Sequence, residues 1–534
     1  MTAATSTAPK HHQATPVERA WEILPGALEW TTFALLLILS WQAPLLMSYA
    51  MILYSLYWLI KSTHVSFHLV WTFRDLRRAA RIDWLGALRE RELRTHDAAD
   101  DTHLDWRDVW HLVVLPTYNE PVEVLQHSIN ALTRSRYPLD RVMVLVCIEE
   151  RAGAAGQEKA AALRKEFGQA FAGFWTVTHP DGRVGEAKVK SANARYGLLQ
   201  TVPELERRGI NLDHVVVSNF DSDTQATPDY FAVLTDAFVA EPQRLRRSYQ
   251  PIPLYHNNFW HVPMLARVSA IGSSFWQMIE ASRPHRLVSF SSHAIPLRAV
   301  LDVGGWDPTR ISEDSRIYWQ CYVHYNGDFA VIPLPVTVTM DCVRDRTWPR
   351  TLRALYKQKQ RWAYGAENLV LVGTKMLGRD HIKAPFGKRL LNVTRMVEGL
   401  YSWGTAAVVL ALGGWLPTLL GGPVFRSTVL GQNFSSVSRF LLTLALVGVA
   451  VSIAISARML PPRPPDVPRR RLVGFFVQWL FTPFVTIIFG SIPAVDAHTR
   501  LMLGRYMEFF VAPKVRATSH PASRAGAAPS AANA

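Results

Sequence analysis

The sequence predicts an α/β domain inserted between the transmembrane helices of a multi-pass membrane protein. One apolar run, residues 30–60, contains no charged side chain, and three more apolar blocks follow later in the chain, near 397–420, 437–457 and 473–495. Residues 105–345 have a different character. Short β-branched runs alternate there with helical segments, a pattern typical of a mostly parallel sheet covered by helices.

The first apolar run is too long for a single span. One helix over residues 30–60 would measure roughly 45 Å, against a hydrocarbon core of about 30 Å. Pro44 offers a break near the middle, so we expect two transmembrane helices within residues 26–72. Four arginines (Arg74, Arg77, Arg78, Arg81) follow this pair, which predicts a cytoplasmic position for its C-terminal end.

The later apolar blocks, within residues 396–495, leave the number of crossings open. The loop 458–471 holds five arginines and is expected to be cytoplasmic. If the following block spans fully, Arg505 and Lys514 lie on the wrong side. Pro483 and Pro493 would let that block form a re-entrant or interfacial segment, so we favour an even number of crossings.

Composition argues against nucleic acid as a partner. The net charge of +15 comes from 58 Lys and Arg against 43 Asp and Glu. Much of the excess lies beside the apolar blocks, so we expect it to anchor the chain to anionic membrane lipid. No zinc-finger, homeodomain or RNP-type pattern is present.

Residues 1–25 and 517–534 are polar or rich in Ala, Pro and Ser, and we expect both to be disordered.

Polar motifs follow the predicted strands. The strands are residues 113–115, 142–148 and 215–217, with helical segments at 156–172 and 187–199. The first and third strands end at Pro116 and Asp221. Ligands of parallel α/β sheets bind beyond the carboxyl ends of the strands, so functional side chains are expected at these two positions.

The Asp221-Ser222-Asp223 motif is a candidate metal site. Two carboxylates at this spacing can share a divalent cation that bridges a diphosphate. Such a pattern alone is usually a solvated turn. Its place after an apolar strand, about 100 residues beyond Pro116-Thr117-Tyr118-Asn119-Glu120, favours Mg²⁺ or Mn²⁺ binding.

A basic amphipathic stretch, residues 350–362, precedes the later apolar blocks. Helical spacings of three and four put Gln358, Arg361 and Trp362 on one face. Such a face can hold a sugar by stacking and a diphosphate by charge. The alternative is a helix that only anchors at the membrane surface.

Five motifs in fixed order resemble a processive membrane glycosyltransferase of family 2, the cellulose synthase and hyaluronan synthase type. They are Pro116 to Glu120, Asp221 to Asp223, Ser312-Glu313-Asp314, Gln358 to Trp362, and Phe509 to Lys514. The resemblance covers roughly residues 25–515. It implies a cytoplasmic, Rossmann-like domain of the GT-A type at 105–345, interfacial helices at 346–395, and an interfacial helix with a gating loop at 496–516.

The resemblance also implies roles for single residues. Tyr118, Glu120 and Glu149 would contact the nucleotide base, Glu149 standing where the family usually has Asp. Lys190 would face the diphosphate, Asp221 would contact the nucleotide and Asp223 would bind the metal. The gating loop would be Phe509, Val511 and Lys514, with Ala512 in place of threonine and a short helix at 500–508 before it.

On the acceptor side, Asp314 matches the catalytic base of an inverting reaction, with Ser312 in place of threonine. Trp306 would offer its ring to a sugar, and Gln358, Arg361 and Trp362 would hold the acceptor terminus and the diphosphate. Phe290-Ser291-Ser292 occupies the place of an acceptor-lining loop, but its residues differ from the cellulose synthase pattern.

The implied function is transfer of sugar from a nucleoside-diphosphate sugar, most often UDP-linked, to a growing polysaccharide at the inner (plasma) membrane. The product would pass through the protein's own helices; because these are few, a homo-oligomer or an export partner would be needed for a pore. Two alternatives remain: transfer of one sugar to a lipid-linked acceptor, or an inactive domain on a transporter or scaffold. The sequence does not identify the sugar, the linkage or the acceptor.

Overall fold

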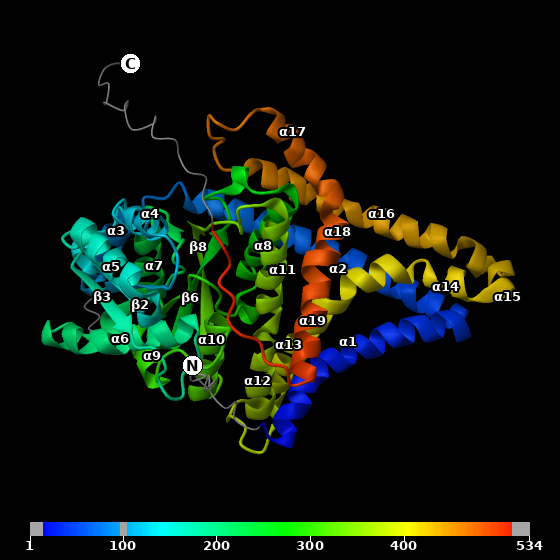
Figure 1. Ribbon diagram of the computed structural model, residues 1–534, viewed down its shortest axis with the longest axis horizontal. Coiled ribbons are helices and arrows are strands. Elements are labelled where there is room, and N and C mark those ends of the chain that lie inside the picture. The colour runs from blue at the N-terminus through cyan, green and yellow to red at the C-terminus, as the bar shows by residue number, and fades with distance from the viewer. Residues whose placement is uncertain (1–13, 97–103, 515–534) are drawn as a thin grey trace, which may run out of the picture.

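The computed structural model describes residues 14–96 and 104–514 (Figure 1). A sheet covered by helices forms one side of the molecule, and long apolar helices extend away from it on the other side. The expected α/β domain between apolar helices is confirmed. Of the expected disordered ends, residues 1–13 and 517–534 lie outside the described residues. The expectation is wrong for residues 16–25, which belong to helix α1 (Pro16–Gln42).

The sheet has eight strands in the order β3-β2-β1-β4-β7-β6-β8-β5. Strands β1 to β4 are parallel to one another, and β7 is antiparallel to both β4 and β6. Strands β6 and β8 are parallel, and β5 is antiparallel to β8. The sheet is therefore mixed, with a parallel half that matches the prediction. The strands are β1 Trp110–Thr117, β2 Val142–Glu149, β3 Gly173–His179, β4 Val215–Asn219, β5 Gln225–Ala226, β6 Arg247–Leu254, β7 Ala294–Pro296 and β8 Ala330–Thr339.

Alternating residues of β1 feed two separate cores. Val113 and Leu115 belong to one buried cluster, whereas Leu112 and Val114 belong to another on the opposite face. This follows from the two-residue period of a strand, and both faces are covered by helices. The helices of the domain are α3 Trp84–His96, α4 Val122–Leu132, α5 Gly153–Phe167, α6 Lys190–Arg207, α7 Tyr230–Ala240, α9 Leu297–Asp302 and α10 Glu313–His324.

Three helices lie between the sheet and the long apolar helices. They are α8 Met264–Ala281, α11 Trp348–Ala363 and α12 Asn368–Leu377. Helix α11 is the predicted amphipathic helix, and it packs against both α8 and α19 (Ile492–Met502). These helices join the functional edge of the sheet to the apolar part of the chain.

The described residues contain five helices long and apolar enough to cross a membrane: α1 Pro16–Gln42, α2 Pro44–Ala79, α13 Phe386–Gly413, α16 Val429–Arg458 and the run Arg470–Met502. The predicted break at Pro44 is observed. Two short helices, α14 Leu416–Leu420 and α15 Gly422–Ser427, join α13 to α16. Helix α1 starts at Pro16, ten residues earlier than expected, because Thr15 and Glu18 form a capping box and Pro16 suits the first helical position.

The last apolar run is not a regular helix. It consists of α17 Arg470–Val477, a 3₁₀ turn, α18 Thr482–Thr486, a π turn at Ile487–Ser491, and α19. In Figure 1, α1, α2, α14 and α16 extend to one side, whereas α17 to α19 run along the border with the sheet domain. The number of membrane crossings stays a prediction.

Helix α19 is fixed to α1. A buried pair joins them, with His498 Nδ1 2.6 Å from Glu29 Oε1, and Arg19 donates to the terminal carbonyls of Leu501 and Met502. These arginine contacts satisfy carbonyl groups that the helix end leaves unpaired.

The segment after α19 is extended rather than helical. The helix ends at Met502, and Gly504 adopts a left-handed φ of +67° that ends helices. The expected helix at 500–508 is therefore wrong. The chain runs back along the sheet domain to Lys514, which forms a backbone bridge with Arg344 (Figure 1).

Candidate active site

Three of the sequence motifs meet beyond the carboxyl ends of β1 and β4. Lys190, the first residue of α6, lies at their centre: its Nζ is 2.7 Å from Asp221 Oδ1 and 3.2 Å from Glu313 Oε1. Asp221 follows β4, and Glu313 starts α10. Strand ends and helix N-termini thus bring together residues far apart in sequence.

Charge is balanced tightly in this cluster. Burial would lower the pKa of the Lys190 ammonium, but Asp221, Asp314 and Glu313 outweigh it and raise that pKa. Burial also opposes ionisation of Asp221, yet Lys190 and Lys514 hold the pKa of its carboxyl well below its usual range. For Glu313, burial and then Asp314 raise the pKa to about 7. The site therefore holds a charged Lys190–Asp221 pair beside a carboxyl that titrates near neutrality.

Asp223 is fully buried, and its two oxygens have different partners. Oδ1 accepts from Lys514 Nζ at 2.5 Å, and Oδ2 accepts from the Asp341 backbone N–H at 2.8 Å. Asp221 uses its second oxygen to accept from Ser291 Oγ at 2.6 Å. Lysine ammonium groups thus contact both carboxylates of the motif. Burial still raises the pKa of the Asp223 carboxyl, although Lys514 opposes this effect.

Asp221 and Asp223 fit a divalent cation whose remaining ligands would come from the diphosphate of a bound nucleotide sugar. Among the described residues, no cluster of three or more His, Cys, Asp or Glu side chains is suited to a metal. Two carboxylates completed by phosphate oxygens and water is, however, a common mode for Mg²⁺. Asp221 and Asp223 would hold the ion, and the ammonium group of Lys514 already shows that cationic charge is favourable beside them.

The region expected to hold the base contains a residue that the sequence did not single out. The Arg151 guanidinium lies 4.1 Å from the centre of the Tyr118 ring, and its Nε contacts Glu149. Glu120 instead closes its own turn, accepting from the Tyr118 N–H at 2.8 Å and from Thr117 Oγ1 at 2.9 Å. The sequence feature that could have indicated Arg151 is its position two residues after Glu149, the carboxylate at the end of β2.

Asp314 is partly open to the site, with a side chain 23% exposed. Its Oδ1 is buried and lies 3.5 Å from His293 Nδ1. Ser312 does not face it: the Ser312 hydroxyl donates to Glu367 Oε1 at 2.7 Å. A hydroxyl that serves as a structural donor explains why serine can stand where the family has threonine.

Trp306 does not have the expected exposed ring. It is 0% exposed within the core cluster that also contains Leu198 and Ile317, and Gly304 and Gly305 precede it with φ of +74° and +89°. The left-handed glycines turn the chain inward, so the ring packs in the core and cannot offer a face to a sugar.

The extended segment after α19, residues 503–514 (the tail), lies against α11. The Arg361 guanidinium is 4.6 Å from the Phe509 ring centre, and Ala512 packs with Val343 and Ala354. Val511 in the tail and Gln358 in α11 are both half-buried. The structure therefore brings the Gln358–Trp362 motif, the tail and the Asp221–Asp223 motif into one region.

Trp362 is held from two sides. Its ring lies 6.2 Å from that of Tyr255, and Lys359 Nζ lies 4.1 Å from its centre. Burial lowers the pKa of Lys359 to about 7.

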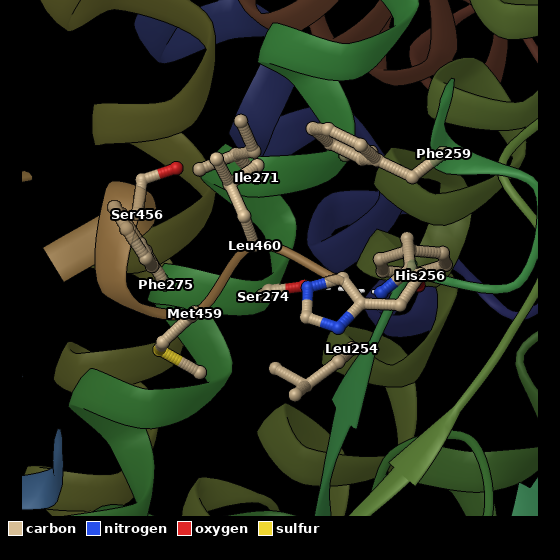
Figure 2. Close-up of a pocket in the computed structure, with 11 residues that line it drawn as sticks. Leu254, His256, Phe259, Ile271, Ser274, Phe275, Ser456, Met459 and Leu460 are labelled. Atoms are coloured by element: carbon tan, nitrogen blue, oxygen red, sulfur yellow. Dashed lines mark hydrogen bonds between the residues drawn. The ribbon is translucent and has the colours of Figure 1, made fainter. Parts of the chain in front are cut away.

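Next to Tyr255, Figure 2 shows a small cavity between α8 and the end of α16, lined by apolar side chains such as Phe275 and Met459. At about 20 Å³ it has room for a water molecule and none for a sugar.

The family comparison agrees with this geometry. Residues 216–460 match the family model described as glycosyl transferase family group 2, a range that includes Asp221, Asp223, Asp314 and α11. No curated protein sequence matches the chain.

Two solved structures share low similarity with the chain. The mannosyltransferase PcManGT from Pyrobaculum calidifontis, in complex with GDP-Man and Mn²⁺, is 14% identical with a TM-score of 0.39, covering 75% of this chain and 99% of that one. S. aureus TarS 1-349, in complex with UDP-GlcNAc, is 10% identical with a TM-score of 0.35, covering 74% and 93%.

The family match over residues 216–460 and the sheet-and-helix architecture therefore identify the protein as a glycosyltransferase whose domain is of the GT-A type and is flanked by long apolar helices.

Proposed function

We propose that the protein is an inverting, metal-dependent glycosyltransferase that extends a polysaccharide at the cytoplasmic face of the inner (plasma) membrane. One observation carries the proposal: Lys190 links Asp221 to Glu313, with Asp314 adjacent to Glu313 at the start of α10. This arrangement supports a site in which Lys190 faces the diphosphate and the partly exposed carboxylate of Asp314 faces the acceptor.

Each residue then has a chemical task. Asp314 takes the proton of the acceptor hydroxyl as that oxygen attacks the anomeric carbon, because a sugar hydroxyl is a poor nucleophile otherwise. Lys190 offers its charge to the diphosphate that leaves on the opposite side. When bound at Asp221 and Asp223, Mg²⁺ or Mn²⁺ neutralises the charge that builds on the leaving group. Tyr118, Glu149 and Arg151 form the candidate site for the nucleotide base.

The neighbourhood of α11 supports a polymer as acceptor. Trp362 supplies an aromatic ring beside Tyr255, and Arg361 supplies a guanidinium beside Phe509 of the tail. These groups suit a sugar ring and a phosphate. Gln358 completes the motif that the resemblance associates with repeated transfer. Product movement through the apolar helices, with an oligomer or export partner, extends this proposal.

The tail supports a closing role over the donor. Lys514 reaches Asp223 and Phe509 lies on Arg361, so this segment spans from the candidate metal site to the candidate acceptor site. Donor binding requires Lys514 to release Asp223 and allows it to turn to the diphosphate, since the ammonium favours either anion.

The test is nucleotide release by purified protein supplied with a panel of UDP- and GDP-linked sugars and Mn²⁺. We expect one donor to support release that stops in excess chelator, and product that lengthens with time. Full release in chelator would contradict the metal assignment. A product of a single added sugar would replace polymerisation with transfer to a lipid-linked acceptor, and no release with any donor would favour an inactive domain on a transporter or scaffold.

A further inference from the structure

A tight turn between α8 and β7 touches both carboxylate motifs. Three successive side chains face different groups: Ser291 Oγ donates to Asp221 Oδ2, Ser292 Oγ lies 3.0 Å from Thr224 Oγ1, and His293 Nδ1 lies 3.5 Å from Asp314 Oδ1. One segment thus connects the donor side of the site with the candidate base.

The backbone of this turn is strained. Ser292 has a φ of +65°, a left-handed conformation uncommon for a residue with a Cβ, and its side chain is fully buried. Such conformations persist only where surrounding contacts impose them, and they concentrate at functional sites. Here Gln250 holds the turn, accepting from the Phe290 N–H at 2.8 Å and donating to the Ser291 carbonyl at 3.1 Å.

The hydrogen bonds fix which nitrogen of His293 carries a proton. Nδ1 lies 2.9 Å from the Phe290 carbonyl oxygen, and a carbonyl only accepts, so Nδ1 is the donor. The side chain is 0% exposed. Its N–H therefore lies between two acceptors, the Phe290 carbonyl and Asp314 Oδ1.

Asp314 Oδ1 needs such a donor. It is buried without a hydrogen-bond partner among the described residues, and an unpaired buried carboxylate oxygen is costly. Because Oδ1 is enclosed while the side chain as a whole is 23% exposed, Oδ2 is the oxygen that can meet an acceptor hydroxyl. Hydrogen bonds at catalytic groups are often long without substrate and shorten in the reactive complex.

We propose that His293 is a positioning residue for Asp314, holding Oδ1 through Nδ1–H so that Oδ2 faces the acceptor hydroxyl. The proposal rests on the proposed role of Asp314 as base. The acceptor proton passes to Oδ2 while the acceptor oxygen bonds to the anomeric carbon and the diphosphate leaves. His293 exchanges no proton; it fixes the orientation of the carboxylate.

The test compares His293→Asn with His293→Leu. These side chains have nearly the same branched shape, but only asparagine carries an N–H donor near the position of Nδ1. We expect His293→Leu to lower kcat at least tenfold, while the donor KM and the Kd for Mn²⁺-UDP or Mn²⁺-GDP stay within about twofold of wild type. His293→Asn should recover most of kcat.

A purely structural role predicts another result. Loss of the turn would also displace Ser291 from Asp221, so nucleotide affinity would fall together with kcat. That outcome, or a His293→Leu variant with wild-type kcat, would overturn the proposal. If the leucine variant does not fold, His293→Gln replaces it, because its amide reaches toward the Nε2 position and should leave kcat low where asparagine restores it.

His111 provides the matched control. It is also fully buried, pairs through Nε2 with Thr235 Oγ1 at 2.8 Å, and has an Nδ1 without a partner among the described residues. It lies at the start of β1, away from the strand ends that carry the motifs. His111→Leu should lower thermal stability as a buried histidine loss does, without a selective fall in kcat.

Asp314→Asn separates this inference from the proposed function. If Asp314→Asn is inactive and His293→Leu is fully active, Asp314 keeps its assignment as the base and only the role of His293 is rejected. An active Asp314→Asn removes the base itself, and the role of His293 with it.

Discussion

At the scale of single residues, Asp314 offers the most direct test of the proposed chemistry. The amide of Asp314→Asn keeps the shape but cannot take the acceptor proton. We expect transfer to fall by about 10² to 10⁴, while nucleotide binding, measured by calorimetry with Mn²⁺-UDP or Mn²⁺-GDP, stays near wild type. Near-normal turnover would exclude Asp314 from the mechanism.

Glu313 predicts a pH dependence of stability. Its folded pKa is raised to about 7, above the ordinary glutamate value of about 4.3, so the folded state favours the protonated form. The contribution of this group is full below the unfolded pKa and is lost as pH rises through about 7. Relative to Glu313→Gln, the wild type should therefore lose thermal stability between about pH 4.5 and pH 7. Parallel melting curves across this range would contradict it.

At the scale of elements, the extended tail and α11 depend on each other. Truncation after Met507 removes the Phe509–Arg361 contact and the Lys514–Asp223 pair, so we expect activity to be lost. Membrane insertion should persist, because the apolar helices remain. A chain ending at Arg516 is the control, since it keeps both contacts. An active Met507 truncation would remove the tail from the site.

Local pattern predicted the elements better than the contacts between them. The break at Pro44, the three apolar strands and the helix at α11 followed from proline geometry, β-branched runs and helical spacing. The burial of Trp306 did not, because a Gly-Gly-Trp turn does not specify which way its ring points. Arg151 and His293 were missed for a related reason: each gains its partner through a turn whose conformation the sequence does not reveal.

At the scale of the whole molecule, we expect the tail to lie on the cytoplasmic side of the membrane. The three native cysteines are buried, so a single introduced cysteine can report position. A cysteine at Ala517, outside the described residues, should resist a membrane-impermeant thiol reagent in intact cells and react once they are opened. A cysteine at Val424, in the exposed link between α13 and α16, should react in intact cells. Labelling of position 517 in intact cells would place the tail outside.

The pair between Lys514 and Asp223 joins residues 291 positions apart. During synthesis the ribosome makes the whole sheet domain, and then α13, α16 and the broken run that ends in α19, before it reaches Lys514. Folding of the sheet alone therefore leaves Asp223 without this partner. The tail can dock only after the later apolar helices have been built and α19 has been set against α1. We therefore expect assembly of the apolar helices to precede completion of the site.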